Sequence, residues 1–277
     1  MKKTITFITG AIILLAGSAY FAFQLKSGNT EATSEISNAQ HTTSDQSLLD
    51  VQIPANVANV RIPHTAYISY FNTQHRIPNC VIYELTATQV AQCDAPTAEK
   101  RKNYKFYPDP LCAQSPQWSD YKNSGYDRGH MAPANDMKWS KASMEESFYM
   151  TNICPQLHEL NDGCWRKLEL AIHKWAKRDK RLIIASGPVL KNVMHTIGPD
   201  QNISVPAAFY KVIYAPEQGR AIGFIFNNEQ IRGGYASHAV SVDYVERVTG
   251  LDFFSALDDA LENQIESHST ITAWTEN

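Results

Sequence analysis

Short apolar runs along the chain predict β-strands. They are rich in β-branched and aromatic residues and are bounded by turn-forming residues such as Pro78, Pro216 and Gly219. One of them ends at Gly187-Pro188, which suits a short buried strand. The predicted strands cover residues 66–71, 81–85, 181–186, 209–214 and 221–226. The first two are separated by a turn-like segment and predict a hairpin.

Other segments carry apolar residues at helical spacing. The predicted helices cover residues 141–150, 162–177, 241–249 and 254–267. Asn161 or Asp162 is expected to cap the second of them, since short polar side chains accept hydrogen bonds from the first free amides of a helix. Strands and helices follow one another without regular βαβ alternation, which predicts an α+β domain and excludes a doubly wound sheet.

The N-terminus carries a targeting pattern. Lys2 and Lys3 precede an apolar stretch over residues 5–23, so residues 1–23 are predicted to be a signal peptide or an N-terminal anchor. A cleavage site could lie at Gly17-Ser18-Ala19, but roughly 20 apolar residues can also span a bilayer, and both possibilities stay open. In either case the bulk of the chain is expected to be exported, periplasmic or secreted, and to touch a membrane only through an uncleaved N-terminal segment.

Composition divides the remaining chain into a linker and a domain. Residues 24–50 are rich in Ser, Thr, Asn, Gln and Glu and cannot bury a core, so they are predicted to be a polar linker. Residues 51–277 are predicted to form the folded domain. The whole chain is 43% hydrophobic and 19% charged, which is ordinary for a globular protein and excludes disorder along its length.

The net charge of −3 does not indicate a nucleic-acid binder, but the charge is distributed unevenly. Basic residues gather over residues 100–141 and 166–181, whereas no Lys or Arg follows Val248. Each basic run taken alone is most simply interpreted as a solvent-exposed face, while the two runs together could form a positively charged groove. Six acids occupy the C-terminal segment: Asp252, Asp258, Asp259, Glu262, Glu266 and Glu276.

The chain contains five cysteines. In an oxidising compartment one or two disulfides are plausible, with Cys80–Cys93 and Cys154–Cys164 as short-loop pairings, and the odd count leaves at least one thiol unpaired. Cys154, His158 and Cys164 could suggest a zinc site, but a fourth ligand is missing and the spacing is irregular.

The stretch Asp127-Arg128-Gly129-His130 places an acid, a base and a histidine within four positions. On an extended segment alternate side chains share a face, so Arg128 and His130 are predicted to point the same way and Asp127 the other. Arg128 could then hold a phosphate beside the point where His130 activates water. Asp127 is predicted to support the backbone or a neighbouring side chain.

A second group of polar residues follows after a helix-length gap. Asn161, Trp165 and Glu169 are spaced so that a continuous helix would place them on one broad side. The Asn161 amide oxygen is a hard, neutral ligand that suits Mg²⁺, and Glu169 could hold the waters of the ion. Outside this context, Asn161 would be a helix cap and Glu169 a solvated charge.

Together these residues resemble the DNA/RNA non-specific endonuclease family, the ββα-metal group that includes mitochondrial endonuclease G. The matching positions are Asp127–His130, residues 151–156, Leu160-Asn161, Trp165 and Leu168-Glu169. The resemblance continues over roughly residues 60–257. It implies a central antiparallel β-sheet flanked by helices, with a ββα-metal unit that carries the active site.

The resemblance also implies roles for individual residues. His130 is expected to be the general base, and Asn161 the direct protein ligand of a hydrated Mg²⁺, with Mn²⁺ as an alternative ion. Glu169 and Asn152 are expected to organise the waters of the metal and the hydrogen bonds around it. Arg128 is expected to contact phosphate oxygens and to stabilise charge in the transition state.

The implied activity is hydrolysis of phosphodiester bonds in DNA and RNA with little sequence specificity, by an exported enzyme. Some family members are homodimers, and the sequence leaves the oligomeric state and the DNA or RNA preference open. Two departures from the family pattern stand out, because His173 occupies a position where many members have Arg, and Cys154 lies inside the second motif.

Two alternatives belong to other functional classes. One is a catalytically weak nucleic-acid-binding protein of the same fold, against which the intact motif residues argue. The other is a hydrolase of a small phosphodiester such as a cyclic nucleotide. The basic runs favour a polymer over a small substrate.

Overall fold

The computed structural model describes residues 47–200 and 202–275. Residues from Leu48 onward form one compact unit. The predicted signal peptide or anchor over residues 1–23, and residues 24–46 of the predicted polar linker, lie outside the described residues. None of the helices in the described part of the chain has the length and apolar character needed to cross a membrane.

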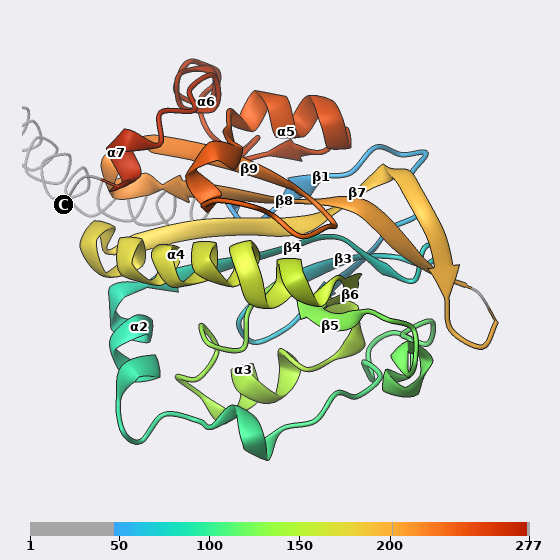
Figure 1. Cartoon of the computed structure of the whole chain (residues 1–277). Coiled ribbons are helices and arrows are strands. Elements are labelled where there is room, and N and C mark those ends of the chain that lie inside the picture. The colour runs from blue at the N-terminus through green and yellow to red at the C-terminus, as the bar shows by residue number, and fades with distance from the viewer. Residues whose placement is uncertain (1–46, 201, 276–277) are drawn as a thin grey trace, which may run out of the picture. The chain divides into compact units, whose positions relative to one another are not determined.

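A seven-stranded antiparallel sheet forms the centre of the molecule (Figure 1), with the strand order β10-β9-β8-β7-β4-β3-β2. In chain order the strands are β2 (Val60–Pro63), β3 (Ile68–Asn72), β4 (Ile77–Thr86), β7 (Arg181–Ile197), β8 (Ile203–Ala215), β9 (Arg220–Asn227) and β10 (Ala239–Val240). The predicted hairpin of β3 and β4 and the predicted pair of β8 and β9 are confirmed. The prediction of an α+β fold around an antiparallel sheet is confirmed as well.

The central strands are buried on both faces, which explains their nearly continuous apolar sequences. Along β4 the side chains of Val81, Tyr83 and Leu85 enter one hydrophobic core, while Cys80 and Ile82 enter a second core on the other face. This alternation follows from the two-residue repeat of an extended chain. The sheet therefore separates two layers, one for each core.

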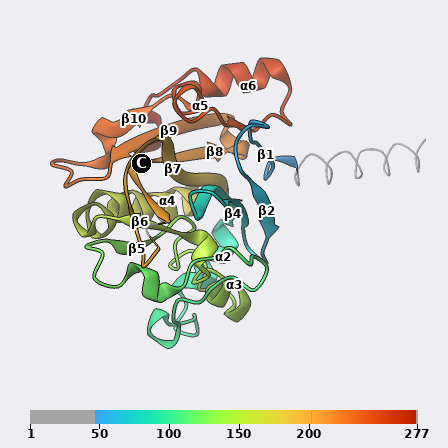
Figure 2. The same cartoon turned by 90° about the vertical axis from the view of Figure 1, so that its right-hand side faces the viewer.

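The first layer carries α2 (Ala87–Asp94), α3 (Lys141–Glu146), α4 (Arg166–Asp179) and the short strand pair β5 (Asp127–His130) and β6 (Ile153–Gln156). The second layer carries α5 (Val242–Thr249), α6 (Asp259–Glu266) and the pair β1 (Val51–Gln52) and β11 (Asp252–Phe253). Figures 1 and 2 show the two layers on opposite sides of the sheet. The short helix α7 (Thr272–Thr275) is the last described element and buries Trp274 in the first core.

Several element boundaries differ from the predictions. Strand β7 continues past Gly187-Pro188, because it is paired with β4 only as far as Ser186, and a strand bonded on one side tolerates a proline. The helix predicted from residue 254 begins at Asp259, since Phe254 adopts a left-handed conformation with φ 57°. Helix α2 was not predicted, although Thr86 and Gln89 form a capping box that the sequence contains.

All five cysteines are free and buried. The suggested pairing of Cys80 with Cys93 is wrong, because Cys80 enters the second core, whereas Cys93 lies on α2 and its Sγ donates to the Asp136 carbonyl over 3.5 Å. Cys154 and Cys164 share the first core without forming a bond. Within the part of the chain that the structure describes, Cys154, His158 and Cys164 do not converge on a common metal position, so no zinc site forms there.

Candidate active site

Strand β5 holds the first motif, and its antiparallel pairing with β6 fixes the orientation of the motif. Arg128 lies opposite Pro155, Gly129 opposite Cys154, and His130 opposite Ile153. A side chain at position 129 would clash with Gln156, because a Cβ atom there would lie 2.4 Å from Gln156 Oε1 and 2.8 Å from Gln156 Cβ. Glycine is therefore required for β5 and β6 to approach this closely.

His130 lies against two phenylalanine rings. The centroid of its ring is 5.3 Å from that of Phe106 and 5.0 Å from that of Phe148, which it meets edge-on. Burial lowers the pKa of His130 to about 3, and the nearby Arg101 guanidinium acts in the same direction. Nε2 is buried and has no hydrogen-bond partner among the described residues. The imidazole is therefore neutral near pH 7, with one ring nitrogen uncommitted.

Asn161 lies in the distorted turn Leu160–Trp165, immediately before α4. Gly163 interrupts the helical backbone there with φ −97° and ψ −111°. Asn161 Nδ2 donates to Asp127 Oδ2 over 2.8 Å, so the amide nitrogen is committed and the amide oxygen is left for another partner. Asp127 also contacts His158 Nδ1 at 2.8 Å.

The structure tests three predictions about the two motifs. Asn161 does not cap α4, because its side chain reaches Asp127 instead. The prediction that Asp127 supports a neighbouring side chain is confirmed. Asn161, Trp165 and Glu169 do not lie on one continuous helix, and Trp165 is buried against Phe209 and Phe226.

Glu169 extends from the first turn of α4. Burial raises its pKa to about 7, while the positive charge of Lys211 acts in the opposite direction. Lys211 is fully buried on β8, where its Nζ donates to Ser186 Oγ over 2.7 Å and lies 4.4 Å from the centre of the Trp165 ring. Burial lowers the pKa of Lys211 to about 8. A lysine inside an apolar strand was the signal in the sequence that could have drawn attention to it.

Arg128 is held in place by its surroundings. Its Nε and Nη2 donate to the Trp118 carbonyl over 3.1 and 2.8 Å. The guanidinium also lies over the rings of Phe106, Trp118 and Tyr121 at 5.5 to 5.9 Å. A guanidinium fixed in this way loses little conformational freedom when it binds an anion.

Four of the five predicted site residues meet at one cavity of about 470 Å³. They are His130, Arg128, Asn161 and Glu169, and Asp127 lines the same cavity. Two cations at its wall, Arg101 and Arg166, were not predicted as site residues, because nothing in their local sequence separates them from the other residues of the basic runs. The cavity is therefore lined by a neutral imidazole, by side chains with oxygen donors and by several positively charged side chains.

Asn152, the fifth predicted site residue, does not line this cavity. Its side chain is fully buried and is bonded only to the backbone: Oδ1 accepts from the Ala132 amide over 2.8 Å, and Nδ2 donates to the carbonyls of Ala132 and Ser147. This arrangement fixes the chain directly after His130. Asn152 therefore contacts backbone near His130 rather than the cavity in which it was predicted to act.

His173 lies one helical turn beyond Glu169, between two carboxylates. Its Nδ1 is 3.1 Å from Asp136 Oδ1 and its Nε2 is 3.2 Å from Asp94 Oδ1. The hydrogen bond to Asp136 and the two negative charges raise the pKa of His173 above its ordinary value, although burial opposes this. Asp136 also accepts from Tyr83, and Asp94 also pairs with Lys177. Through its contact with Asp94, His173 joins α4 to α2, and the contact becomes an ion pair when the imidazole is protonated.

Protonation of His173 is expected to make stability depend on pH. Folding raises the pKa of His173, so its protonation contributes to the free energy of unfolding. This contribution is complete below pH 6.5 and is lost as pH rises through the pKa of the folded state. The free energy of unfolding of the natural protein should therefore fall relative to that of His173→Arg over this window, measured by urea titration. His268→Arg, at an exposed site, is the control. Parallel pH profiles for the natural protein and His173→Arg would contradict the prediction.

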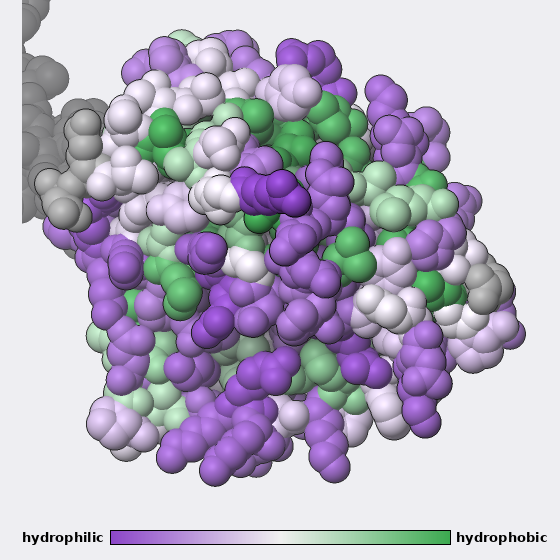
Figure 3. Space-filling model, in the orientation of Figure 1, coloured by the Kyte–Doolittle hydropathy of each residue, from purple (hydrophilic) through white to green (hydrophobic). Residues whose placement is uncertain are grey.

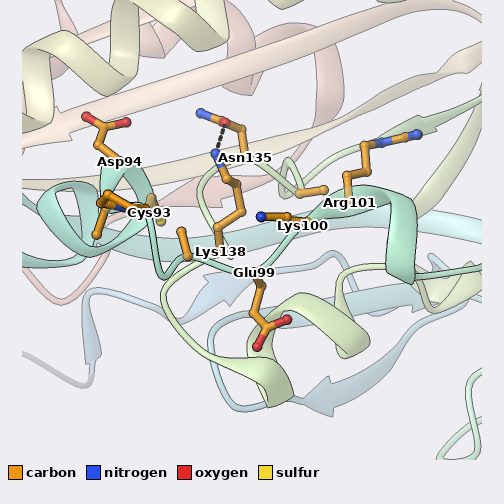
Figure 4. A pocket seen from close by; sticks show the side chains of 11 residues that line it. Cys93, Asp94, Glu99, Lys100, Arg101, Asn135 and Lys138 are labelled. Atoms are coloured by element: carbon orange, nitrogen blue, oxygen red, sulfur yellow. Dashed lines mark hydrogen bonds between the residues drawn. The ribbon is translucent and has the colours of Figure 1, made fainter.

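A second cavity of about 570 Å³ adjoins the first, and Arg101, Ala134 and Asn135 line both. Ala95, Pro96 and Ala98 are among the apolar residues that line it. Figure 4 shows Lys138 extending toward Asn135, where its Nζ donates to Asn135 Oδ1 over 3.2 Å, while the Glu99 carboxylate points away. The face that carries α4 is largely hydrophilic (Figure 3).

Comparisons with known proteins agree with this geometry. Residues 44–260 match the family model described as DNA/RNA non-specific endonuclease. The chain belongs to the DNA/RNA non-specific endonuclease family. Members of this family of endonucleases are metal-dependent phosphodiester hydrolases, and the chain is accordingly an enzyme of that class.

Two curated relatives show the breadth of the endonuclease family. The chain is 30% identical to "Nuclease EXOG, mitochondrial" of Mus musculus over 91% of this chain and 72% of the relative. It is 28% identical to "Nuclease" of Serratia marcescens over 76% of this chain and 80% of the relative. A solved chain from a structure titled as the EndoG/EndoGI complex, on the mechanism of EndoG inhibition, superposes with a TM-score of 0.66 at 27% identity. That superposition covers 72% of this chain and 86% of the other.

Proposed function

We propose that this endonuclease hydrolyses phosphodiester bonds of DNA and RNA with little sequence preference, using His130 as general base and Mg²⁺ at Asn161. One observation carries the proposal. His130 Nε2 has no hydrogen-bond partner among the described residues, and His130 lines the same cavity as Asn161, whose amide nitrogen is bonded to Asp127. A base and a hard oxygen donor thus share one space with Arg128 and Arg101.

The chemistry follows from the charges of the site. A phosphodiester is an anion that repels hydroxide, so attack requires a base that removes a proton from water at neutral pH. At neutral pH the lowered pKa leaves the His130 imidazole unprotonated, and Nε2, which has no hydrogen-bond partner among the described residues, is the atom that would accept this proton. Arg128 and Arg101 would stabilise the negative charge that grows on the phosphate oxygens.

The donor set at the cavity fits a hard cation. The Asn161 oxygen would be the direct ligand, and Glu169 would bind the waters that Mg²⁺ retains. Mn²⁺, which accepts the same ligands, is the alternative ion. When bound, such an ion clamps the scissile phosphate and eases departure of the 3′ oxygen.

Low sequence preference is expected from the lining of the two cavities. The cations Arg101, Arg128, Lys100 and Lys138 can contact phosphates, which position a nucleic acid without reading its bases. DNA and RNA present the same phosphodiester to these groups. The preference between them stays open, as does assembly into a homodimer.

Supercoiled plasmid and a structured RNA test the proposal. Both should be degraded when Mg²⁺ is present, and neither when a chelator is added or when the His130→Ala variant is used. Plasmid that is retarded in a gel but stays intact with the natural protein would instead support the catalytically weak binding protein. Preferential cleavage of a cyclic nucleotide over plasmid in competition would support the small-diester hydrolase.

Lys138→Gln is expected to weaken binding of a long substrate. Loss of one phosphate contact should lower affinity for all sequences alike and reduce the slope of log affinity against log salt by about 1. Cleavage of a small chromogenic phosphodiester should be unchanged, because that substrate does not reach the second cavity. Lys102→Gln is the matched control, since Lys102 is exposed and lies outside both linings. Equal effects of the two substitutions would refute a role for the second cavity.

Export is part of the proposal. It depends on residues 1–23, which lie outside the described residues, and on the Lys2 and Lys3 charge pattern. The relatives do not determine the location, since that from Mus musculus bears the name of a mitochondrial nuclease. Fractionation of cells that produce the whole chain, with an antibody against the domain, would test it.

A further inference from the structure

Helices α5 and α6 bring three carboxylates together in the second layer of the molecule. Asp243 and Glu246 lie one turn apart on α5, and Glu266 is the last residue of α6. One carboxylate oxygen from each of the three lies within 4.8 Å of the other two. Unless something offsets it, such an approach of like charges destabilises the contact between the helices.

Glu266 makes the cluster more than a patch of surface acids. Its side chain is 5% exposed, and its Oε1 is buried without a hydrogen-bond partner in the described chain. An ionised carboxylate is rarely buried unless it is paired or coordinates a metal. Glu246, in contrast, accepts a hydrogen bond from the Phe253 amide over 2.8 Å.

The charged groups that act on Glu266 are all acidic, so none of them offsets the negative charge of its carboxylate. Burial raises the pKa of Glu266 to about 9, and the negative charges of Glu246, Glu262, Asp243 and Asp252 act in the same direction. Burial also raises the pKa of Glu246 to about 7. The sequence contains no Lys or Arg after Arg247, and the Arg247 guanidinium lies over the Tyr244 ring at 4.9 Å. The acidic C-terminal segment therefore lacks a cation of its own.

We propose that Asp243, Glu246 and Glu266 bind a Ca²⁺ ion that joins α5 to α6. Three carboxylates supply hard oxygen ligands, and the exposed side of Asp243 leaves room for waters to complete a shell of six to eight. Ca²⁺ tolerates such an irregular shell, whereas Mg²⁺ requires nearly octahedral geometry. The ion would replace mutual repulsion with attraction between the two helices.

This site is separate from catalysis. Helices α5 and α6 pack on the second core, while the catalytic cavity lies in the layer of the first core, across the sheet (Figure 2). The role is therefore structural, and it does not depend on the proposed nuclease chemistry. It can be measured by stability and binding, without any assay of cleavage.

The test is a thermal unfolding series with Ca²⁺ alone, on the full chain and on variants. At a Ca²⁺ concentration about 100 times Kd, Tm should rise by roughly 5 °C or more for a domain of this size. Asn161→Ala removes the proposed catalytic ligand and should retain the rise. Glu266→Gln should abolish it, and Asp259→Asn, on the same helix but outside the cluster, should retain it.

Calorimetric titration supplies a second readout. In the Asn161→Ala protein we expect one Ca²⁺ site, and none after Glu266→Gln is added. If Glu266→Gln fails to fold, Asp243→Asn decides, with an expected loss of affinity of about 10-fold or more. Absence of a Ca²⁺-dependent rise in the Asn161→Ala protein would overturn the proposal. A rise that persists in both cluster variants would overturn it as well.

Discussion

Replacement of His130 by alanine is expected to lower kcat on plasmid DNA by roughly 10²–10⁴-fold, the usual contribution of a positioned general base. KM should change little, because the imidazole acts on water and the phosphate contacts come from Arg128 and Arg101. The measurement is a steady-state nicking assay at saturating metal, with the unfolding temperature recorded beside it because His130 packs on Phe106 and Phe148.

Two observations separate the loss of a base from damage to the fold. Imidazole added to the medium should restore part of the activity of His130→Ala, since a free base can enter the space left by the ring. His268→Ala, an exposed histidine beyond α6, should behave as the natural protein. A kcat within 10-fold of the natural value, with the fold intact, would remove His130 from its proposed role.

Replacement of Asn161 by alanine is expected to raise the Mg²⁺ concentration for half-maximal activity by about 100-fold or more. Residues that only orient a metal ligand typically contribute roughly 10–100-fold, and a direct ligand should contribute at least as much. The readout is a titration of cleavage rate with Mg²⁺ at fixed substrate. Asp127→Ala should shift the same curve by a smaller factor, because Asp127 orients the Asn161 amide through Nδ2 without contacting the ion itself.

Asn263→Ala provides the matched control for this series. It removes an asparagine from α6, in the layer that lacks the catalytic cavity, and should leave the Mg²⁺ titration unchanged. If Asn161→Ala lowers the maximal rate but leaves the Mg²⁺ midpoint in place, Asn161 does not bind the metal. Its contact with Asp127 would then be the reason for its effect.

The sequence was most informative where a local pattern reports a local structure. Short apolar runs bounded by turn-forming residues predicted the hairpin of β3 and β4 and the pair of β8 and β9. The limits of the helices were less accurate, because Gly163 and the left-handed Phe254 change the backbone in ways that apolar spacing does not report.

The catalytic constellation was only partly visible before the fold was known. His130 and Arg128 share a strand, so their common orientation follows from a two-residue repeat. The contact of Asp127 with Asn161 spans 34 positions and depends on how β5 meets the distorted turn before α4. Arg101 comes from a different part of the chain altogether.

By itself, then, the sequence determined the family and the α+β class, and it predicted His130 as the base and Asn161 as the oxygen donor, because these inferences depend on residue types at short separations. The tertiary structure decided which charges face one another. It buried Lys211 near Glu169, placed His173 between Asp94 and Asp136, and gathered Asp243, Glu246 and Glu266 between two helices. The physical reason is that contacts between distant segments are set by packing on the two faces of the sheet, and the local spacing of apolar residues reports which face of an element is buried but not which distant charged residue it will meet.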